Sequence, residues 1–452
     1  MSYYRDTITA IATAPGKGGV GIVRVSGSQA WRIAKEMTNL ALKPRYAHYT
    51  SIFAHEQNKL DEGIVIYFKA PHSFTGEDIV EFQGHGGPII LDLILQEVVR
   101  LGARIAEPGE FSQRAFLNDK MDLVQAEAIA DMIDASSEQA AKSALKSLQG
   151  DFSNAINSLV EKLIHLRVYV EAAIDFPEEE IDLLSDAHIH DGYRKIIDEL
   201  DEVLNKSQQG VLLREGIQVV IAGKPNAGKS SLLNALSGRE SAIVTHIAGT
   251  TRDVLKESIQ INGVPLHIID TAGIRESDDI VENLGIERAI MAISEADHIL
   301  MVCDLTDVDS NQPGKVLERL IPIEHKPRNA EITYVMNKVD LVSDDTAPKS
   351  KNTVYISAKN NEGIEALKSR ILSSVGYQMN TEGVFTARTR HLKAIYIAKE
   401  HLANAADHLF NKDGELLAEE LRLSQTALSQ ITGSFNADDL LGEIFSSFCI
   451  GK

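Results

Sequence analysis

The fold of the middle of this chain is decided by Gly223-Lys224-Pro225-Asn226-Ala227-Gly228-Lys229-Ser230, which fits the pattern G-x-x-x-x-G-K-[ST]. The stretch follows a strand-like run at 217–222 and precedes a helical run at 231–236, which is the context of a phosphate-binding loop. Backbone N–H groups of such a loop hold phosphates, the Lys229 ammonium adds a point charge, and the Ser230 hydroxyl is offered to Mg²⁺. The sequence therefore predicts a nucleotide-binding α/β domain that begins near residue 216.

Three further motifs follow in the order expected of a GTP-binding domain. In Asp270-Thr271-Ala272-Gly273, Asp270 is expected to contact the ligands of Mg²⁺ rather than the ion itself. Gly273 can donate its N–H to the γ-phosphate. The carboxylate of Asp340 is expected to accept two hydrogen bonds from guanine; adenine lacks those donors, so ATP is a poor alternative. The predicted GTP-binding residues are Asn226, Ala227, Gly228, Lys229, Ser230, Ser231, Thr245, His246, Ile247, Ala248, Gly249, Thr250, Thr251, Asp270, Thr271, Ala272, Gly273, Asn337, Lys338, Asp340, Ser357, Ala358 and Lys359.

The segment 245–253 suits a loop that becomes ordered on the γ-phosphate, because it contains glycine and several threonines. A threonine here is expected to complete the Mg²⁺ shell, and Thr251 is favoured. Ras-type GTPases orient the attacking water with a Gln after the D-x-x-G motif, but this chain has Ile274 there, which cannot orient water. Spacing alone does not choose among the polar residues nearby, which are Arg275, Glu276, Asp278, Asp279, Glu282 and Glu287.

The chain changes character along its length, which predicts three domains. Residues 1–118 mix strand-like runs at 21–26 and 63–68 with a helical run at 88–101, which predicts an α+β domain. Residues 119–215 and 377–452 are helical, whereas 216–376 alternate strands and helices, which predicts a P-loop G domain with a mostly parallel sheet. Because helical segments flank the α/β unit, the simplest topology is one discontinuous all-α domain into which the G domain is inserted.

The helical region carries one apolar stripe with steps of three and four residues. Such a stripe predicts a helix face packed in an ordinary helix-on-helix core, rather than a coiled-coil dimer seam. Gly150 lies inside the stripe and is expected to bend or break the helix. The stripe consists of Leu145, Leu148, Phe152, Ile156, Leu159, Leu163, Leu166 and Val170.

Composition excludes several classes of protein. The net charge is −20, while residues 1–120 hold 13 basic and 13 acidic residues, so a global basic field for nucleic acid is excluded and a local patch would be needed. The sequence contains no stretch of 18 apolar residues, so it predicts no membrane span. It also has no apolar run at its start, so it predicts no signal peptide. Cys303 and Cys449 form no metal-spaced pair, and a reducing cytoplasm is expected.

Two local patterns resemble a dinucleotide-binding motif and a metal site, but we interpret neither as functional. Residues 16–21 match G-x-G-x-x-G but precede a strand, whereas a dinucleotide fingerprint follows a strand and opens a helix. His85 lies in the glycine turn 84–87 and is interpreted as structural rather than as a metal ligand. Cys303 lies in an apolar run and is interpreted as an inert core thiol. Cys449 lies in a short tail where exposure is expected; it could be nucleophilic if a cation or metal lowered its pKa, and an incidental tail cysteine is the alternative.

Taken together, the motifs resemble one family, the tRNA-modification GTPases of the MnmE (TrmE) type. The residues that carry the resemblance are 16–24, 223–231, 245–253, 270–273 and the ending Phe448-Cys449-Ile450-Gly451-Lys452. The resemblance implies GTP hydrolysis that depends on K⁺, with Asn226, Thr245, Ile247 and Thr250 as ligands of the ion. It also implies Glu282 as the residue that orients water.

The resemblance further implies a pathway and partners. With an FAD-containing MnmG-type protein, such GTPases modify C5 of the wobble uridine of certain tRNAs, and a homodimer is expected. The one-carbon unit comes from a reduced folate, 5-formyl- or methylene-tetrahydrofolate, and Cys449 is expected to be functional. Either Arg24 or Lys120 could pair the folate's glutamate tail, and Glu81 could bind the pterin edge. The implied folate-binding residues are Arg24, Glu81, Lys120 and Lys452.

Two alternatives remain open from the sequence. A ribosome-assembly GTPase would share the G-domain motifs but usually has an RNA-binding domain with a basic face, which the neutral N-terminal region and acidic helices do not predict. A folate-dependent aminomethyltransferase with a regulatory GTPase would bind folate at the same N-terminal residues, so folate binding would not distinguish it.

Overall fold

The computed structural model describes residues 6–175, 187–238, 256–270, 294–307, 313–320, 330–342, 352–378, 383–433, 438–446 and 448–451. Its contacts divide the chain into two compact units. The first unit contains Met1–Ala130, Ser147–Ile197 and Ala394–Lys452. The second contains Asp131–Lys146 and Asp198–Lys393. Within the described residues, no helix is both long enough and apolar enough to cross a membrane.

The N-terminal part of the first unit is a six-stranded sheet in the order β3-β4-β5-β2-β1-β6. Neighbouring strands are antiparallel except for β1 and β6. Alternate residues such as Val23, Val25 and Phe82 are buried against two helices, α1 and α2, so these helices cover one face of the sheet. The elements are β1 Ile8–Ile11, β2 Gly18–Ser26, α1 Ala30–Thr38, β3 His48–Phe53, η1 His55–Gln57, β4 Lys59–Phe68, β5 Ile79–Gly86, α2 Pro88–Arg100, β6 Arg104–Ile105 and α3 Glu110–Leu117.

Long helices form the all-α region, and the apolar stripe is mostly buried as expected. Gly150 has φ +95° and separates two helices, α5 and α6, which confirms the predicted break. Phe152 and the later stripe positions are buried, but Leu145 is 44% exposed because the break resets the helix phase. Helix α6 contacts α13 through Arg167 and Gln425, and Tyr193 of α7 donates to the Leu402 carbonyl of α12. The helices are α4 Leu123–Asp134, α5 Glu138–Gln149, α6 Asp151–Asp175, α7 Ala187–Glu215, α12 Thr389–Asn411, α13 Gly414–Thr432 and α14 Asp438–Ser446.

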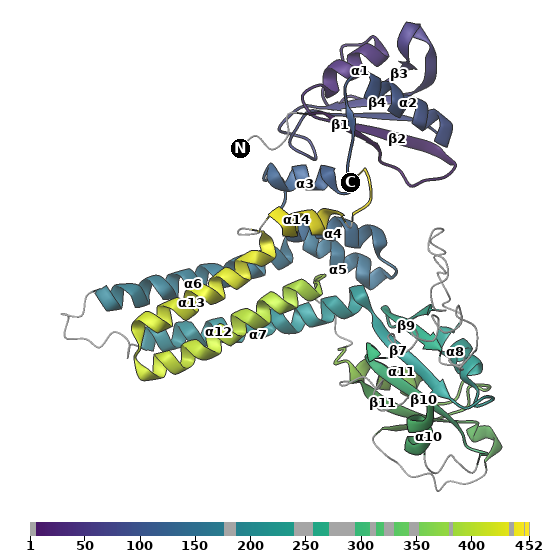
Figure 1. Ribbon diagram of the computed structural model, residues 1–452, viewed down its shortest axis with the longest axis vertical. Coiled ribbons are helices and arrows are strands. Elements are labelled where there is room, and N and C mark those ends of the chain that lie inside the picture. Colours follow the sequence, from purple (N-terminus) through teal and green to yellow (C-terminus); the bar gives the residue numbers. More distant parts are fainter. Residues whose placement is uncertain are drawn as a thin grey trace. The chain divides into compact units, whose positions relative to one another are not determined.

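The G domain is a doubly wound sheet in the order β12-β11-β10-β7-β9-β8, parallel except for β8. One face is covered by α8 and α11 and the other by α10, so each face has its own apolar core (Figure 1). This confirms the predicted fold class. Ligands of such sheets bind outside the carboxyl ends of the strands. The elements are β7 Ile217–Gly223, α8 Lys229–Ser237, β8 Lys256–Ile261, β9 Val264–Asp270, β10 His298–Asp304, α10 Pro313–Leu320, β11 Glu331–Asn337, η6 Val339–Leu341, β12 Thr353–Ile356 and α11 Ile364–Ser374.

Candidate functional site

The phosphate-binding loop turns tightly between β7 and α8. Asn226 and Gly228 have φ of +65° and +95°, so the backbone curls back toward the strand before the helix starts at Lys229. The Lys229 Nζ donates to the carbonyl oxygens of Gly223 at 2.9 Å and Lys224 at 3.2 Å. These bonds hold the ammonium over the loop, where its charge can meet the phosphates of a nucleotide.

Asn337 connects three of the nucleotide motifs to one another. Its side chain is buried, donates from Nδ2 to the Ala227 carbonyl at 2.9 Å, and accepts from the Ala358 N–H at 3.1 Å. A Cβ at Gly228 would collide with Asn337 Nδ2, so only glycine fits beneath this bridge. The motifs predicted that Asn337 is a GTP-binding residue. They did not predict that its amide ties the phosphate loop to residues 357–359, the segment predicted to contact guanine.

The carboxylate of Asp340, which the sequence predicts to select guanine, is oriented by the Ser357 hydroxyl. Ser357 Oγ donates to Asp340 Oδ1 at 2.6 Å and accepts from the Asn360 N–H at 3.2 Å. Beside it, Lys338 has φ +71° and reaches Asp304 Oδ2 at 2.5 Å. Burial works to raise the pKa of Asp304, but the hydrogen bonds from Lys338 and Thr306 outweigh it and hold that pKa below its usual value. Asp304 is therefore a carboxylate that positions Lys338.

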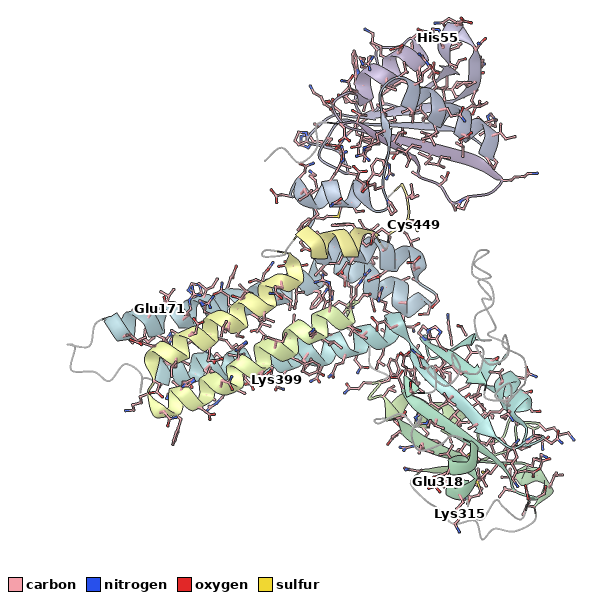
Figure 2. The ribbon with its side chains drawn as sticks, viewed as in Figure 1. His55, Glu171, Lys315, Glu318, Lys399 and Cys449 are labelled. Carbon is pink, nitrogen blue, oxygen red and sulfur yellow. The ribbon has the colours of Figure 1, made fainter. Side chains whose placement is uncertain are left out.

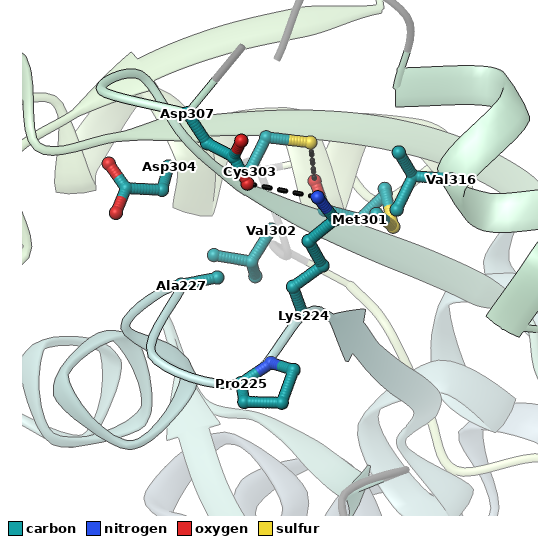
Figure 3. A pocket seen from close by; sticks show the side chains of 9 residues that line it. All are labelled: Lys224, Pro225, Ala227, Met301, Val302, Cys303, Asp304, Asp307 and Val316. Carbon is teal, nitrogen blue, oxygen red and sulfur yellow. Dashed lines mark hydrogen bonds and ion pairs between the residues drawn. The ribbon is translucent and has the colours of Figure 1, made fainter. Parts of the chain in front are cut away.

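A small cavity of about 50 Å³ lies beside the phosphate loop (Figure 3). The Lys224 ammonium crosses it to Asp307 at 3.0 Å, and the cavity is too small for a nucleotide. Burial, with the negative charge of Asp307, raises the pKa of Cys303 to about 11, so this thiol stays protonated and inert as predicted. The lining residues are Lys224, Pro225, Ala227, Met301, Val302, Cys303, Asp304, Asp307 and Val316.

Several predicted site residues lie outside the described residues. For Asp270 the backbone is described, and it ends β9 on the strand next to β7. The predictions for the loop before β8, for the rest of the D-x-x-G motif, for the water-orienting residue and for the last residue of the chain stay predictions. They concern Thr245, His246, Ile247, Ala248, Gly249, Thr250, Thr251, Thr271, Ala272, Gly273, Glu282 and Lys452.

A second polar cluster lies in the first unit, on the sheet face that α1 and α2 leave uncovered. Arg24 of β2 pairs with Glu81 of β5 at 3.0 Å, directly across the antiparallel register. The Arg24 guanidinium also lies 5.7 Å from the ring centres of Phe74 and of Phe111. Its Nη1 donates to the Gly451 carbonyl at 3.3 Å, so the end of the chain meets the N-terminal sheet.

The C-terminal tail is anchored on both sides of its cysteine. Phe448 is buried in an apolar cluster with α4 and α14, and Gly451 has φ +96° where a Cβ would meet the Ile11 carbonyl. Between these anchors, Cys449 is exposed (Figure 2). Its carbonyl accepts from the Gly109 N–H at 3.4 Å. The predicted exposure is therefore confirmed, and the thiol is carried by a fixed backbone.

Lys120 reaches the same neighbourhood through a loop. Its Nζ donates to the Pro71 carbonyl at 3.0 Å, and Phe74 of that loop contacts Arg24. The structure thus brings Arg24, Glu81 and the tail together directly, and Lys120 through one intervening loop. The sequence contained no local signal for this cluster, because 427 positions separate Arg24 from Gly451.

The glycine turn at 84–87 has a structural explanation. Asp61 is buried and accepts from the His85 backbone N–H and from Nδ1, each at 2.7 Å. Burial works to raise the pKa of Asp61, but these bonds outweigh it and hold that pKa below its usual value. In the described part of the chain, no group of three His, Cys, Asp or Glu side chains could hold a metal. His85 therefore orders the turn, as expected.

Two family models match this chain. The family model "MnmE helical domain" matches residues 123–449, and "GTP-binding protein TrmE N-terminus" matches residues 7–120. A tRNA modification GTPase MnmE of Hydrogenovibrio crunogenus is 57% identical and matches 99% of both chains. The protein of the same name from Ectopseudomonas mendocina is 54% identical over 100% of both.

A solved structure of Era from Aquifex aeolicus with bound GDP and AlF₄⁻ shares 27% identity. It covers 41% of this chain and 66% of its own, with a TM-score of 0.27, which is too low to add support. The end-to-end identity to the curated relatives is decisive and excludes the ribosome-assembly alternative. The chain belongs to the MnmE family of tRNA modification GTPases, and it is a GTPase that acts in tRNA modification.

Proposed function

We propose that this GTPase requires K⁺ and works with an FAD-containing MnmG-type partner to modify C5 of the wobble uridine of certain tRNAs. A reduced folate, 5-formyl- or methylene-tetrahydrofolate, would supply the carbon. The observation that carries the proposal is the polar cluster of Arg24, Glu81 and the tail, which would serve as a second site besides the nucleotide loop. GTP and tRNA are ligands that fit the family.

In the nucleotide site, Lys229 and Ser230 would hold the β- and γ-phosphates and Mg²⁺. The Ser230 side chain is exposed at the first turn of α8, next to the ammonium that the loop carbonyls hold in place. A hydroxyl at that point suits Mg²⁺, which prefers oxygen ligands, and Thr251 would supply the other protein oxygen. Bound Mg²⁺ neutralises charge on the phosphates, and the chain's own contribution is to orient them.

The proposed K⁺ ligands are Asn226, Thr245, Ile247 and Thr250. Support comes from Asn226, which is exposed in the phosphate loop with φ +65°, so its amide oxygen is available beside the phosphates. A cation at the transition state is worth up to about 10³–10⁵ in rate when an arginine supplies it. Turnover of GTP should therefore be much faster in potassium than in sodium buffer, and equal turnover would contradict the proposal. Asn226→Ala should abolish the difference between the two salts.

At the folate site, the contacts favour a division of roles. Arg24 forms an ion pair with Glu81 and donates to the Gly451 carbonyl. The Arg24–Glu81 pair therefore offers donors and acceptors side by side, which suits the pterin edge. Lys120 is held by the Pro71 carbonyl, and among the described residues it makes no ion pair. We therefore assign the folate's glutamate carboxylates to Lys120, with Lys452 as a second cation.

Binding of 5-formyl-tetrahydrofolate to the purified protein tests this site. Glu81→Gln should weaken binding by about tenfold or more, since a hydrogen bond to a charged group is worth about 1.5–3 kcal/mol. Glu62→Gln is a matched control, because Glu62 is on the neighbouring strand and pairs only with the exposed Lys59 among the contacts described. Equal binding by both variants would rule out the assignment of Glu81.

Cys449 is proposed to act in the modification itself, and Glu282 to orient water for GTP hydrolysis. The exposed thiol, fixed between Phe448 and Gly451, lies two residues from the carbonyl that Arg24 contacts. A thiolate at that position could serve as nucleophile and the thiol as proton donor. We further propose a cytoplasmic homodimer and the three domains 1–118, 119–215 with 377–452, and 216–376.

Analysis of tRNA nucleosides tests the function as a whole. Cells lacking this protein should lose the modification at C5 of the wobble uridine, and the wild-type gene should restore it. Complementation by Lys229→Ala would measure whether GTP hydrolysis is needed. A normal nucleoside profile in the deleted strain would refute the proposed reaction.

A further inference from the structure

Both segments that connect the G domain to the helices meet at one buried carboxylate. Asp131, near the end of α4, is 9% exposed. Its Oδ1 accepts from Arg214 Nε, at the end of α7, and from Arg388 Nη2, just before α12, each at 2.7 Å. The chain enters the G domain directly after Arg214, and the segment by which it returns from residue 376 to α12 ends at Arg388, so a single oxygen joins the entering and the returning segments.

A second carboxylate repeats this arrangement. Glu215 accepts from Arg214 Nη1 at 3.0 Å and from Thr389 Oγ1 at 2.9 Å. We call Asp131, Arg214, Glu215, Arg388 and Thr389 the crossing cluster. It borders a polar cavity of about 170 Å³, which has room for several water molecules. An ion cluster beside a polar cavity can exchange partners for water, whereas an apolar contact of the same area cannot.

The crossing cluster is bonded to the strands that lead to the nucleotide. The Glu215 carbonyl bonds His267 Nε2 of β9 at 3.0 Å, and His267 Nδ1 bonds Ser258 Oγ of β8 at 3.1 Å. At the hairpin turn, Gln260 donates to the Ser136 carbonyl. The strand that starts here, β9, ends at Asp270 of the D-x-x-G motif, and β7 ends at the phosphate loop.

Strands β7 and β9 span the distance between the crossing cluster and the nucleotide motifs. Each has seven residues, which at about 3.3 Å per residue is on the order of 20 Å. A parallel, hydrogen-bonded sheet is stiff along its strands, so a shift at one end reaches the other. The predicted γ-phosphate contacts lie in the segment that precedes β8 and in the segment that follows β9. In the sequence, both segments therefore flank the β8–β9 hairpin.

We propose that Asp131 is the positioning residue that couples the nucleotide state to the helical segments 131–146 and 383–393. Asp131 lies outside all of the predicted nucleotide motifs and acts only through the two arginines that it binds. Its double ion pair makes the end of α4, the end of α7 and the start of α12 move as one body with β7, β8 and β9. Without it, GTP would still be hydrolysed, but hydrolysis would no longer drive tRNA modification. This inference uses only GTP hydrolysis and tRNA modification, so it stands independently of K⁺ and folate.

Asp131→Asn tests the proposal, because the amide keeps the shape and one oxygen but removes the charge that holds two arginines. Asp134→Asn is the matched control: it lies on the same helix and borders the same cavity but is exposed. We expect kcat and KM for GTP within about twofold of wild type in both variants. We expect wobble-uridine modification to fall at least about fivefold in Asp131→Asn alone, which is the lower end of usual coupling between sites. Asp131→Glu should restore part of the loss.

Hydrogen exchange of the full-length protein separates coupling from mere stability. In wild type, amides of 131–146 and 383–393 should exchange at different rates with GDP and with a non-hydrolysable GTP analogue. In Asp131→Asn that difference should vanish, while the G-domain strands keep theirs. Normal tRNA modification, a persisting exchange difference, or a parallel loss of GTP hydrolysis would each overturn the proposal.

Discussion

Replacement of Asp340 by Asn should exchange the base specificity of the G domain. Ser357 Oγ accepts from the Asn360 N–H, so its own hydrogen is directed at Asp340 Oδ1, 2.6 Å away. An asparagine would keep its carbonyl oxygen on that hydroxyl and turn its NH₂ toward the base. Guanine presents N–H donors there, so donor would face donor, whereas xanthine presents a carbonyl at the 2-position.

The size of the effect follows from the charge of the carboxylate. Two hydrogen bonds to a charged group, at about 1.5–3 kcal/mol each, correspond to a rise of about 10²–10⁴ in the Kd for GTP. The assay is titration of GTP and xanthosine triphosphate analogues against the purified protein, with affinity for the xanthine nucleotide expected to rise. Ser357→Ala is the control for orientation, and it should cost about 1 kcal/mol without any gain for xanthine. Unchanged GTP affinity in Asp340→Asn would refute the guanine-site assignment.

Three other outcomes are expected. Burial, with the positive charge of Arg370, lowers the pKa of His298 to about 4. As the pH falls, the unfolded chain therefore takes up this proton before the folded chain does. The free energy of unfolding of the G domain should fall by about 3 kcal/mol between about pH 6.5 and about pH 4, and this stability is fully present above pH 6.5. Urea unfolding of wild type and His298→Phe over this range checks it, and an identical pH dependence in both would exclude His298. Glu282→Ala should lower kcat about 10²-fold, or about 2.7 kcal/mol, with little change in GTP affinity, and a wild-type rate would return Glu282 to an ordinary solvated charge. Cys449→Ser should abolish wobble-uridine modification in cells while purified protein still hydrolyses GTP; normal modification would make the cysteine incidental.

Local chemistry explains which features could be predicted. The phosphate loop is recognisable because its glycines and Lys229 lie within eight consecutive residues. The alternation of Val23 and Val25 with polar residues in β2 likewise indicates a strand with one buried face. The break at Gly150 was predictable for the same reason, since it needs only the backbone freedom of glycine. Its effect on Leu145 was not, because the phase of a helix beyond a break depends on its neighbours.

The amino-acid sequence was sufficient to predict the class of nucleotide site, the three types of folded region and the residues that could bear the chemistry. It was sufficient because each depends on contacts within a few residues. Folding, in contrast, brings Arg24 to Gly451, Asn337 to Ala227, and Asp131 to both Arg214 and Arg388. These pairs are distant in the chain, and a charged side chain far from its partner reads as an ordinary solvated residue. Burial of the carboxylate or guanidinium makes such a pair specific, and burial is a property of the folded chain.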